Sequence, residues 1–223
     1  MAALALVAVP TLAACTTGPV TERHNNYDVS GTVTRLVLTG TDGDVRVSTR
    51  DGPVTVAETI AFTADEPTTS HRVDGSTLYV EVDGCGKTIR MDRCDVSFDI
   101  TVPGSTAVEV TLVAGTVEVQ DLSGDLRIRT TAGGIEASGL RGQHVDVRTE
   151  AGEVTLAHQV APVQTSARSE AGAVTVRLPG TGGYAVDATT DAGKRDVSVS
   201  VDPGSAHRVT AWTEAGNVIV SPA

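Results

Sequence analysis

Four acidic side chains occupy one repeated position of this sequence, each directly before an Ala-Gly pair. They are Glu150, Glu170, Asp191 and Glu214, and Thr131 holds the same position in a looser copy. On stacked strands these positions would form a row, which we call the acidic row, with neighbours about 4.8 Å apart. Like charges at that spacing cost on the order of 1 kcal/mol per pair in water. Such a row could bind a divalent cation, contact a ligand, or take part in polysaccharide hydrolysis.

Basic side chains accompany part of the acidic row. Two residues upstream, on the same strand face, the copies carry Arg129, Arg148 and Arg168, and then Thr189 and Trp212. The last two carboxylates therefore lack a basic neighbour, so a cation, a basic partner or solvent must take that place. A solvated surface row with weak ion pairs is the alternative to a cation or ligand face.

The acidic row lacks the features of a catalytic pair. Catalysis by two carboxylates requires different environments for the two groups, whereas positions related by a repeat have similar ones. The sequence also contains no nucleophile elbow, zinc-protease motif, phosphate loop or calcium-binding nonapeptide array. We therefore expect no enzyme, no cofactor and no metal site, and keep a polysaccharide-active β-helix enzyme as an alternative.

Trp212 is the single tryptophan of the chain and belongs to the last copy of the motif. Its position predicts an outward-facing indole. One interpretation is a sugar-stacking or protein-contact site. The other is a bulky cap over the terminal coil of a repeat protein.

Cys85 and Cys94 flank a short polar loop between two strand-like runs. In an oxidising compartment two such cysteines most simply form one disulfide. A metal site would need more ligands, and no histidine lies beside the pair in sequence. We expect the disulfide, with a metal site or free thiols as the alternatives.

The N-terminal run ALALVAVPTLAAC is too short to span a bilayer and has the length of a signal-peptide core. Its last four residues, Leu-Ala-Ala-Cys, resemble a bacterial lipobox, which implies cleavage of residues 1–14 and lipidation of Cys15. Because no Lys or Arg precedes the run, we expect the true start to lie upstream, unless the signal interpretation is wrong. Residues 15–27 are polar and predict a tether.

Glycines recur through the second half of the chain at intervals of 18, 19, 20, 21 and 23 residues. A period near 20, with a second weaker turn inside it, predicts a parallel β-solenoid with two short strands per coil. We expect one domain over residues 28–223, with irregular coils in 28–103 and regular coils in 104–223. The recurrent glycines should form the corners of the coils: Gly115, Gly133, Gly152, Gly172, Gly193 and Gly216.

Composition agrees with a narrow, acidic β-protein. Hydrophobic residues make up 40% of the 223 residues but aromatic residues only 3%, so a thin core of aliphatic side chains is expected. The net charge of -11 argues against nucleic acid as a partner, since phosphate binding needs clustered Lys and Arg.

The stretches TDGDVRVSTRDGPVTV and CDVSFDITVPGSTAVEV, followed by the Ala-Gly coils, resemble bacterial β-strand-repeat proteins grouped as candidate adhesins of unknown function. The resemblance covers about residues 28 to 220. It implies an exported or lipid-anchored β-solenoid and brings no catalytic residues.

These observations predict a non-catalytic lipoprotein on the outer face of the bacterial cytoplasmic membrane. Its role would be adhesion or binding of a surface polymer such as an envelope glycan. A regulatory or structural lipoprotein that contacts a membrane protein is the alternative. The exposed terminal coil could also pair weakly with a second copy of the chain.

Overall fold

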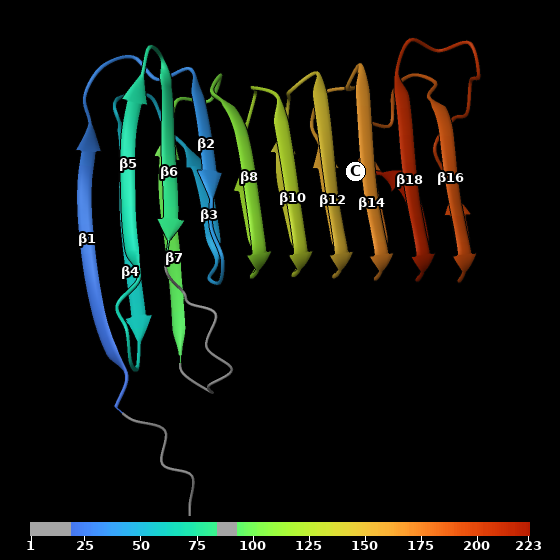
Figure 1. Ribbon diagram of the computed structural model, residues 1–223. Coiled ribbons are helices and arrows are strands. Elements are labelled where there is room, and N and C mark those ends of the chain that lie inside the picture. The colour runs from blue at the N-terminus through green and yellow to red at the C-terminus, as the bar shows by residue number, and fades with distance from the viewer. Residues whose placement is uncertain (1–18, 84–92) are drawn as a thin grey trace, which may run out of the picture.

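Two β-sheets face each other along the whole length of the protein (Figure 1). The computed structural model describes residues 19–83 and 93–223, and no helix occurs among them. The first sheet has the strand order β1-β4-β7-β3-β9-β11-β13-β15-β19-β17, and the second has the order β16-β18-β14-β12-β10-β8-β2-β6-β5. The prediction of an all-β protein is confirmed.

Each coil of the middle region gives one strand to each sheet, and all neighbouring strands there are parallel. The two strands of one coil are therefore separated by a corner, as the spacing of the glycines predicts. In chain order the strands are β8 (Ala107–Ala114), β9 (Val117–Gln120), β10 (Leu126–Ala132), β11 (Ile135–Leu140), β12 (His144–Ala151), β13 (Val154–His158), β14 (Gln164–Ala171) and β15 (Val174–Leu178).

The N-terminal end is less regular because it includes antiparallel pairs. Strand β4 runs antiparallel to both β1 and β7, and β5 forms an antiparallel hairpin with β6. The β2–β3 coil lies between the β6–β7 layer and β8–β9. The strands are β1 (Thr21–Val29), β2 (Arg35–Thr39), β3 (Val45–Thr49), β4 (Val54–Phe62), β5 (Thr68–Asp74), β6 (Thr77–Asp83) and β7 (Cys94–Val102).

The last coil in sequence is not the last coil in space. Strand β18 (Arg208–Ala215) lies between β14 and β16 (Ala185–Ala192). Likewise β19 (Val218–Pro222) lies between β15 and β17 (Arg195–Val197). The expectation that Trp212 caps the terminal coil is therefore wrong, and the exposed edge belongs to β16 and β17 instead.

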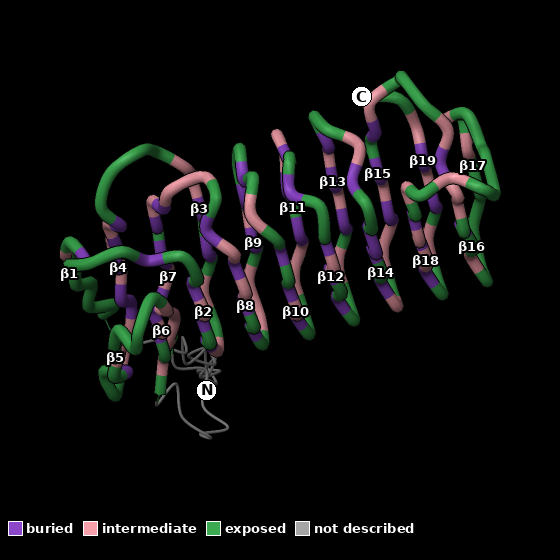
Figure 2. Tube along the Cα trace, turned by 90° about the horizontal axis from the view of Figure 1, so that it is seen from above, coloured by how far each residue is buried: buried purple, intermediate pink, exposed green. Residues whose placement is uncertain are grey.

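The core is a thin layer of aliphatic side chains between the sheets. Figure 2 marks the buried residues of both sheets in purple along the chain trace. Along β12, for example, Val145 and Val147 are buried while Asp146 and Arg148 face outward, which is the alternation of a sheet with one solvated face. Tyr184 and Phe98 are the only aromatic side chains in the buried core of the described residues. The low aromatic content thus reflects the narrow space between the sheets.

The recurrent glycines form the corners, in close contact from coil to coil. A Cβ atom added to any of the six would lie between 1.8 and 2.2 Å from the carbonyl oxygen of a glycine in the adjacent coil. Gly115, with φ of +126°, would meet the oxygen of Gly43 at 2.0 Å. Five of the six have positive φ, and Gly193 does not. The close approach of neighbouring backbones therefore requires glycine at all six positions. At the five positions other than Gly193 the positive φ is a second reason for glycine.

Buried hydroxyl groups complete these corners, a role that the sequence analysis missed. Thr149 Oγ1 donates to the carbonyl oxygen of Gly133 at 3.0 Å, and Ser169 Oγ donates to that of Gly152 at 2.8 Å. Thr213 and Thr190 make the same contact with Gly172 and Gly216. Each hydroxyl satisfies a glycine carbonyl of the neighbouring coil, and thereby joins one coil to the next.

The predicted tether over residues 15–27 is wrong in its second half, because β1 begins at Thr21 and pairs with β4 over nine residues. Its polar side chains are mostly exposed on an edge strand, so the sequence looked like a linker. Tyr27 Oη and Asn25 Nδ2 donate to the buried carboxylate of Glu58 at 2.9 and 3.3 Å. Burial and the bond to Glu58 raise the pKa of Tyr27 well above its ordinary value.

The predicted signal segment, residues 1–14, and Cys15 lie outside the described residues. No helix of the described ranges has the length and hydropathy of a membrane span.

Cys85 also lies outside the described residues, while Cys94 is the first residue of β7, so its pairing with Cys85 stays a prediction. Closing a loop of this length should contribute about 2.5 to 3 kcal/mol. We therefore expect a reducing agent to lower the melting temperature, and expect a Cys85→Ser, Cys94→Ser variant to melt at the reduced temperature in either condition. Rapid labelling of both thiols in the native, unreduced protein would contradict the disulfide.

Candidate functional site

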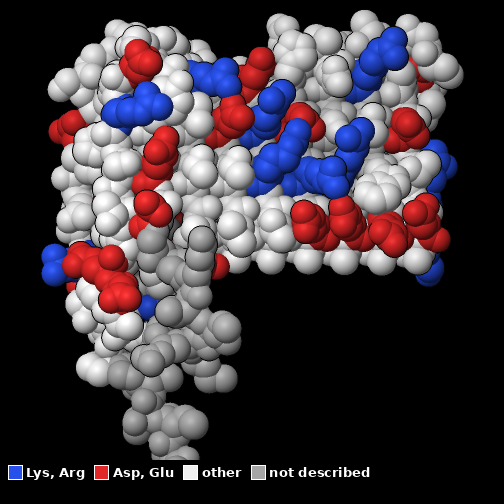
Figure 3. Space-filling model, viewed as in Figure 1, with Lys and Arg blue, Asp and Glu red and all other residues white. Residues whose placement is uncertain are grey.

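The outer face of the second sheet gathers the chain's predicted site residues in two parallel rows. The register places Arg129, Arg148 and Arg168 directly beside one another on β10, β12 and β14, and we call them the basic row. Trp212 and Thr189 continue that row on β18 and β16. Figure 3 shows this face, with a band of basic side chains beside a line of acidic ones. The predicted arrangement of two charged rows is confirmed.

The acidic row follows the order of the strands in space and not that of the chain. Because β18 lies between β14 and β16, Glu214 stands between Glu170 and Asp191. Glu150, Glu214 and Asp191 are exposed, and Glu170 is half-buried. The strand next to β14 therefore carries the single tryptophan, directly beside Arg168.

Ion pairs neutralise part of this face. Arg148 Nη2 contacts Glu170 Oε1 at 2.6 Å, and Arg129 Nη2 contacts Asp146 Oδ2 at 2.6 Å. Glu150, Asp191 and Glu214 make no ion pair with any described residue. The expectation that the last two carboxylates lack a basic partner agrees with these contacts, and solvent or a partner is left to screen them.

The acidic row does not form a compact metal site. Among residues 19–83 and 93–223 no three His, Cys, Asp or Glu side chains lie close enough together to hold a metal ion. Carboxylates in a row present one oxygen pair per strand, whereas calcium requires six to eight oxygen ligands. A ligand face is thus the better of the two specific interpretations of this row.

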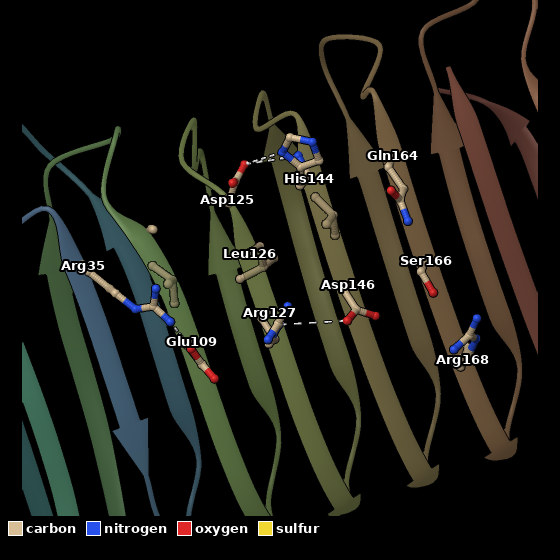
Figure 4. A pocket seen from close by; sticks show the side chains of 13 residues that line it. Arg35, Glu109, Asp125, Leu126, Arg127, His144, Asp146, Gln164, Ser166 and Arg168 are labelled. Atoms are coloured by element: carbon tan, nitrogen blue, oxygen red, sulfur yellow. Dashed lines mark hydrogen bonds and ion pairs between the residues drawn. The ribbon is translucent and has the colours of Figure 1, made fainter. Parts of the chain in front are cut away.

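A hollow of about 600 Å³ crosses the same face, over β2, β8, β10, β12 and β14 (Figure 4). Its walls carry side chains of both charges, including Arg35, Arg127, Asp146 and His144. His144 Nδ1 lies 3.3 Å from Asp125 Oδ1. The hollow runs across the strands rather than along one of them, as a site for an extended ligand would.

Ser166 lies in this hollow and was not found by the sequence analysis. It faces outward on β14 between Gln164 and Arg168, yet only 7% of its surface is exposed. Its Oγ is buried and has no hydrogen-bond partner among the described residues. Nothing in the sequence distinguishes it from the other outward serines and threonines, because its burial depends on side chains of neighbouring strands.

Comparison with known proteins concerns the fold and the family. A family model described as Toastrack DUF4097 matches residues 40–218. A crystal structure of a candidate cell adhesion protein from Clostridium sporogenes is similar with a TM-score of 0.57 and 13% identity, over 91% of this chain and 100% of that one. A candidate adhesin from Bacteroides fragilis has a TM-score of 0.48 and 16% identity, over 91% and 97% of the two chains. No curated protein matches the sequence.

Proposed function

The chain belongs to the Toastrack DUF4097 family, whose model matches most of its length, and on this premise we propose that it binds a polymer of the bacterial cell surface. The site is the outer face of the second sheet. The observation that carries the proposal is the hollow of about 600 Å³ across five strands. It is lined by charged side chains and by the buried hydroxyl of Ser166, which has no partner among the described residues. Mixed charges and polar groups on an open face suit an extended hydrophilic chain.

The fold supports binding rather than catalysis. Parallel coils present the same side-chain position at a regular spacing of about 4.8 Å, which suits a repetitive ligand. The carboxylates of the acidic row occupy equivalent positions on successive strands. Glu150, Glu214 and Asp191 are exposed, and Glu170 is held by Arg148, so none is the buried, uncompensated carboxyl group that serves as a general acid. The protein is accordingly a non-catalytic binding module that needs no cofactor.

The proposed location is the outer face of the cytoplasmic membrane, with Cys15 as the lipid anchor. The lipobox-like ending Leu12-Ala13-Ala14-Cys15 supports it, and β1 starts only six residues after Cys15. With a tether that short, the N-terminal end of the sheets stays close to the membrane. Metabolic labelling with a lipid precursor should mark the native chain and not a Cys15→Ser variant.

The binding function is tested by capture from solubilised cell envelope, with the full-length chain in mild detergent as bait. A face variant, Arg127→Ala, His144→Ala, Trp212→Ala, alters the second sheet. A matched control, Glu136→Ala, Thr155→Ala, Arg177→Ala, alters outward side chains of the first sheet. We expect polysaccharide to be retained by the native chain and the control but lost by the face variant.

Other outcomes of the capture decide against the proposal. Equal retention by all three chains would exclude the outer face of the second sheet as the site. Retention of no polymer, with one membrane protein recovered instead, would favour the regulatory lipoprotein.

A further inference from the structure

Arg168 differs from the other arginines of the basic row because no carboxylate of residues 19–83 and 93–223 pairs with it. Arg129 and Arg148 each contact an acidic side chain at 2.6 Å, whereas Arg168 makes no ion pair within the described ranges and is exposed. A guanidinium group stays charged at every physiological pH and presents a planar pair of donors that fits a carboxylate or a phosphate. Arg168 is thus a cation available to a ligand.

Ser166 supplies a second, independent observation at the same place. It stands two residues before Arg168 on the outer face of β14, and both line the hollow (Figure 4). Its Oγ is buried and finds no hydrogen-bond partner in the part of the chain that the structure describes, a situation that native proteins rarely tolerate. A ligand oxygen next to Arg168 would supply the missing hydrogen bond.

Trp212 adds an apolar surface beside these polar groups. It is the register partner of Arg168 on the adjacent strand, so the two Cα atoms lie about 4.8 Å apart. The indole is half-buried on the outer face. A half-buried tryptophan presents a flat apolar surface on which a sugar ring can stack.

We propose that this part of the face recognises a saccharide that carries an anionic group. The carboxylate or phosphate lies against Arg168 and Ser166, and a sugar ring lies on Trp212. The inference rests on the binding function proposed above and specifies its ligand.

The surrounding charges limit how much negative charge the ligand can carry. The acidic row lies two residues further along the same strands, and the chain as a whole has a net charge of -11. A dense polyanion would be repelled by both. The ligand therefore has isolated anionic groups, as in a single uronic acid or sugar phosphate within a chain of neutral sugars.

The fluorescence of the single tryptophan tests the inference at the site itself. The full-length chain in detergent is titrated with maltotriose in which one glucose is replaced by glucuronate, with maltotriose that carries one phosphate group, and with neutral maltotriose, and calorimetry is run in parallel. We expect one of the anionic probes to change the emission of Trp212 saturably. Arg168→Gln should weaken that binding about tenfold or more, since it removes a charged hydrogen bond, and Ser166→Ala should weaken it severalfold.

Arg177→Gln is the matched control, because Arg177 is an exposed arginine of β15, on the other sheet, that also makes no ion pair within the described ranges. The Arg177→Gln variant should change the affinity for the probe by no more than about twofold, because it removes no hydrogen bond to the ligand, whereas Arg168→Gln removes a charged one. The anionic probe whose binding is weakened by Arg168→Gln shows whether the recognised group is a carboxylate or a phosphate.

Equal binding of neutral maltotriose, unaffected by Arg168→Gln, would overturn the inference but leave the proposed binding function standing. If no probe binds but polymer is still captured from the cell envelope, the inference about the ligand is wrong and the binding function still stands. If no polymer is captured either, both proposals are wrong.

Discussion

Replacing Gly115 by alanine should destabilise the protein by about 2 to 5 kcal/mol, a large part of the stability of a typical domain. Two costs add at this position. A side chain at a φ of +126° costs about 1 to 2 kcal/mol. In addition, the new methyl group would lie 2.0 Å from the carbonyl oxygen of Gly43, so the coils must move apart, which typically costs about 1 to 3 kcal/mol.

Gly52→Ala is the matched control, because Gly52 has nearly the same φ, +130°, and nothing within 4 Å of its added Cβ. It should lose only the conformational part, about 1 to 2 kcal/mol. Both variants are measured by urea unfolding, with circular dichroism for the whole chain and Trp212 fluorescence for the C-terminal coils. Equal losses in the two variants would show that the coils accept a methyl group at the corner.

The corners could be predicted from the sequence because their cause is local. Wherever two coils touch at the backbone only glycine fits, so each contact leaves a glycine in the sequence. The hydroxyl groups had a nearly regular signal, since Thr or Ser stands three residues before five of the six corner glycines, as Thr149 does before Gly152 and Thr213 before Gly216, while Leu112 stands before Gly115. Because alternate side chains of a strand point into the core, and these positions have the same parity as the buried valines, the signal predicts a buried hydroxyl.

The order of the last coils could not be predicted for the opposite reason. The strands around Thr189 and Trp212 both end in the same acidic-Ala-Gly corner, and both pair in the same register with Ala-Gly neighbours. No local feature decides which of them lies next to β14. The choice depends on contacts of the long connection, such as Ser205 Oγ with the Gly183 carbonyl and His207 Nδ1 with the Pro162 carbonyl, and these join distant parts of the chain.

The sequence predicted which charged side chains form the candidate site, but it did not predict the hollow that they line. The basic and acidic rows follow from side-chain parity, which the sequence contains. The hollow depends on which strands are neighbours and on how far their side chains reach, as with Arg35 and Glu109, which pair across β2 and β8. The pairing of β2 with β8 spans distant parts of the sequence, so no repeat spacing could have indicated it.

Acidification should destabilise the protein through His158, which is buried at the end of β13. Its Nε2 lies 3.0 Å from Thr165 Oγ1, and its Nδ1 is buried without a partner among the described residues. Burial lowers the pKa of His158 to about 4 from an ordinary 6.5, because a charged imidazole in the core has lost its solvation.

The sign follows from which state binds the proton. Above pH 6.5 the imidazole is neutral in both the folded and the unfolded chain, so His158 has no pH-dependent effect there. As the pH falls from 6.5 towards 4 the unfolded chain takes up a proton that the folded chain does not, and stability is lost over that window. The loss between pH 7.5 and pH 5 should be about 2 kcal/mol.

A double variant, His158→Leu, Thr165→Val, isolates this effect by replacing both buried partners with apolar side chains, which avoids leaving a polar group unpaired. Urea unfolding at the two pH values should show a loss smaller by about 2 kcal/mol in the double variant than in the native chain. His144→Gln, which removes an exposed imidazole, serves as the control and should retain the native loss. An equal loss in the double variant and the native chain would mean that His158 is protonated within the fold, and that the core at β13 admits enough water to solvate it.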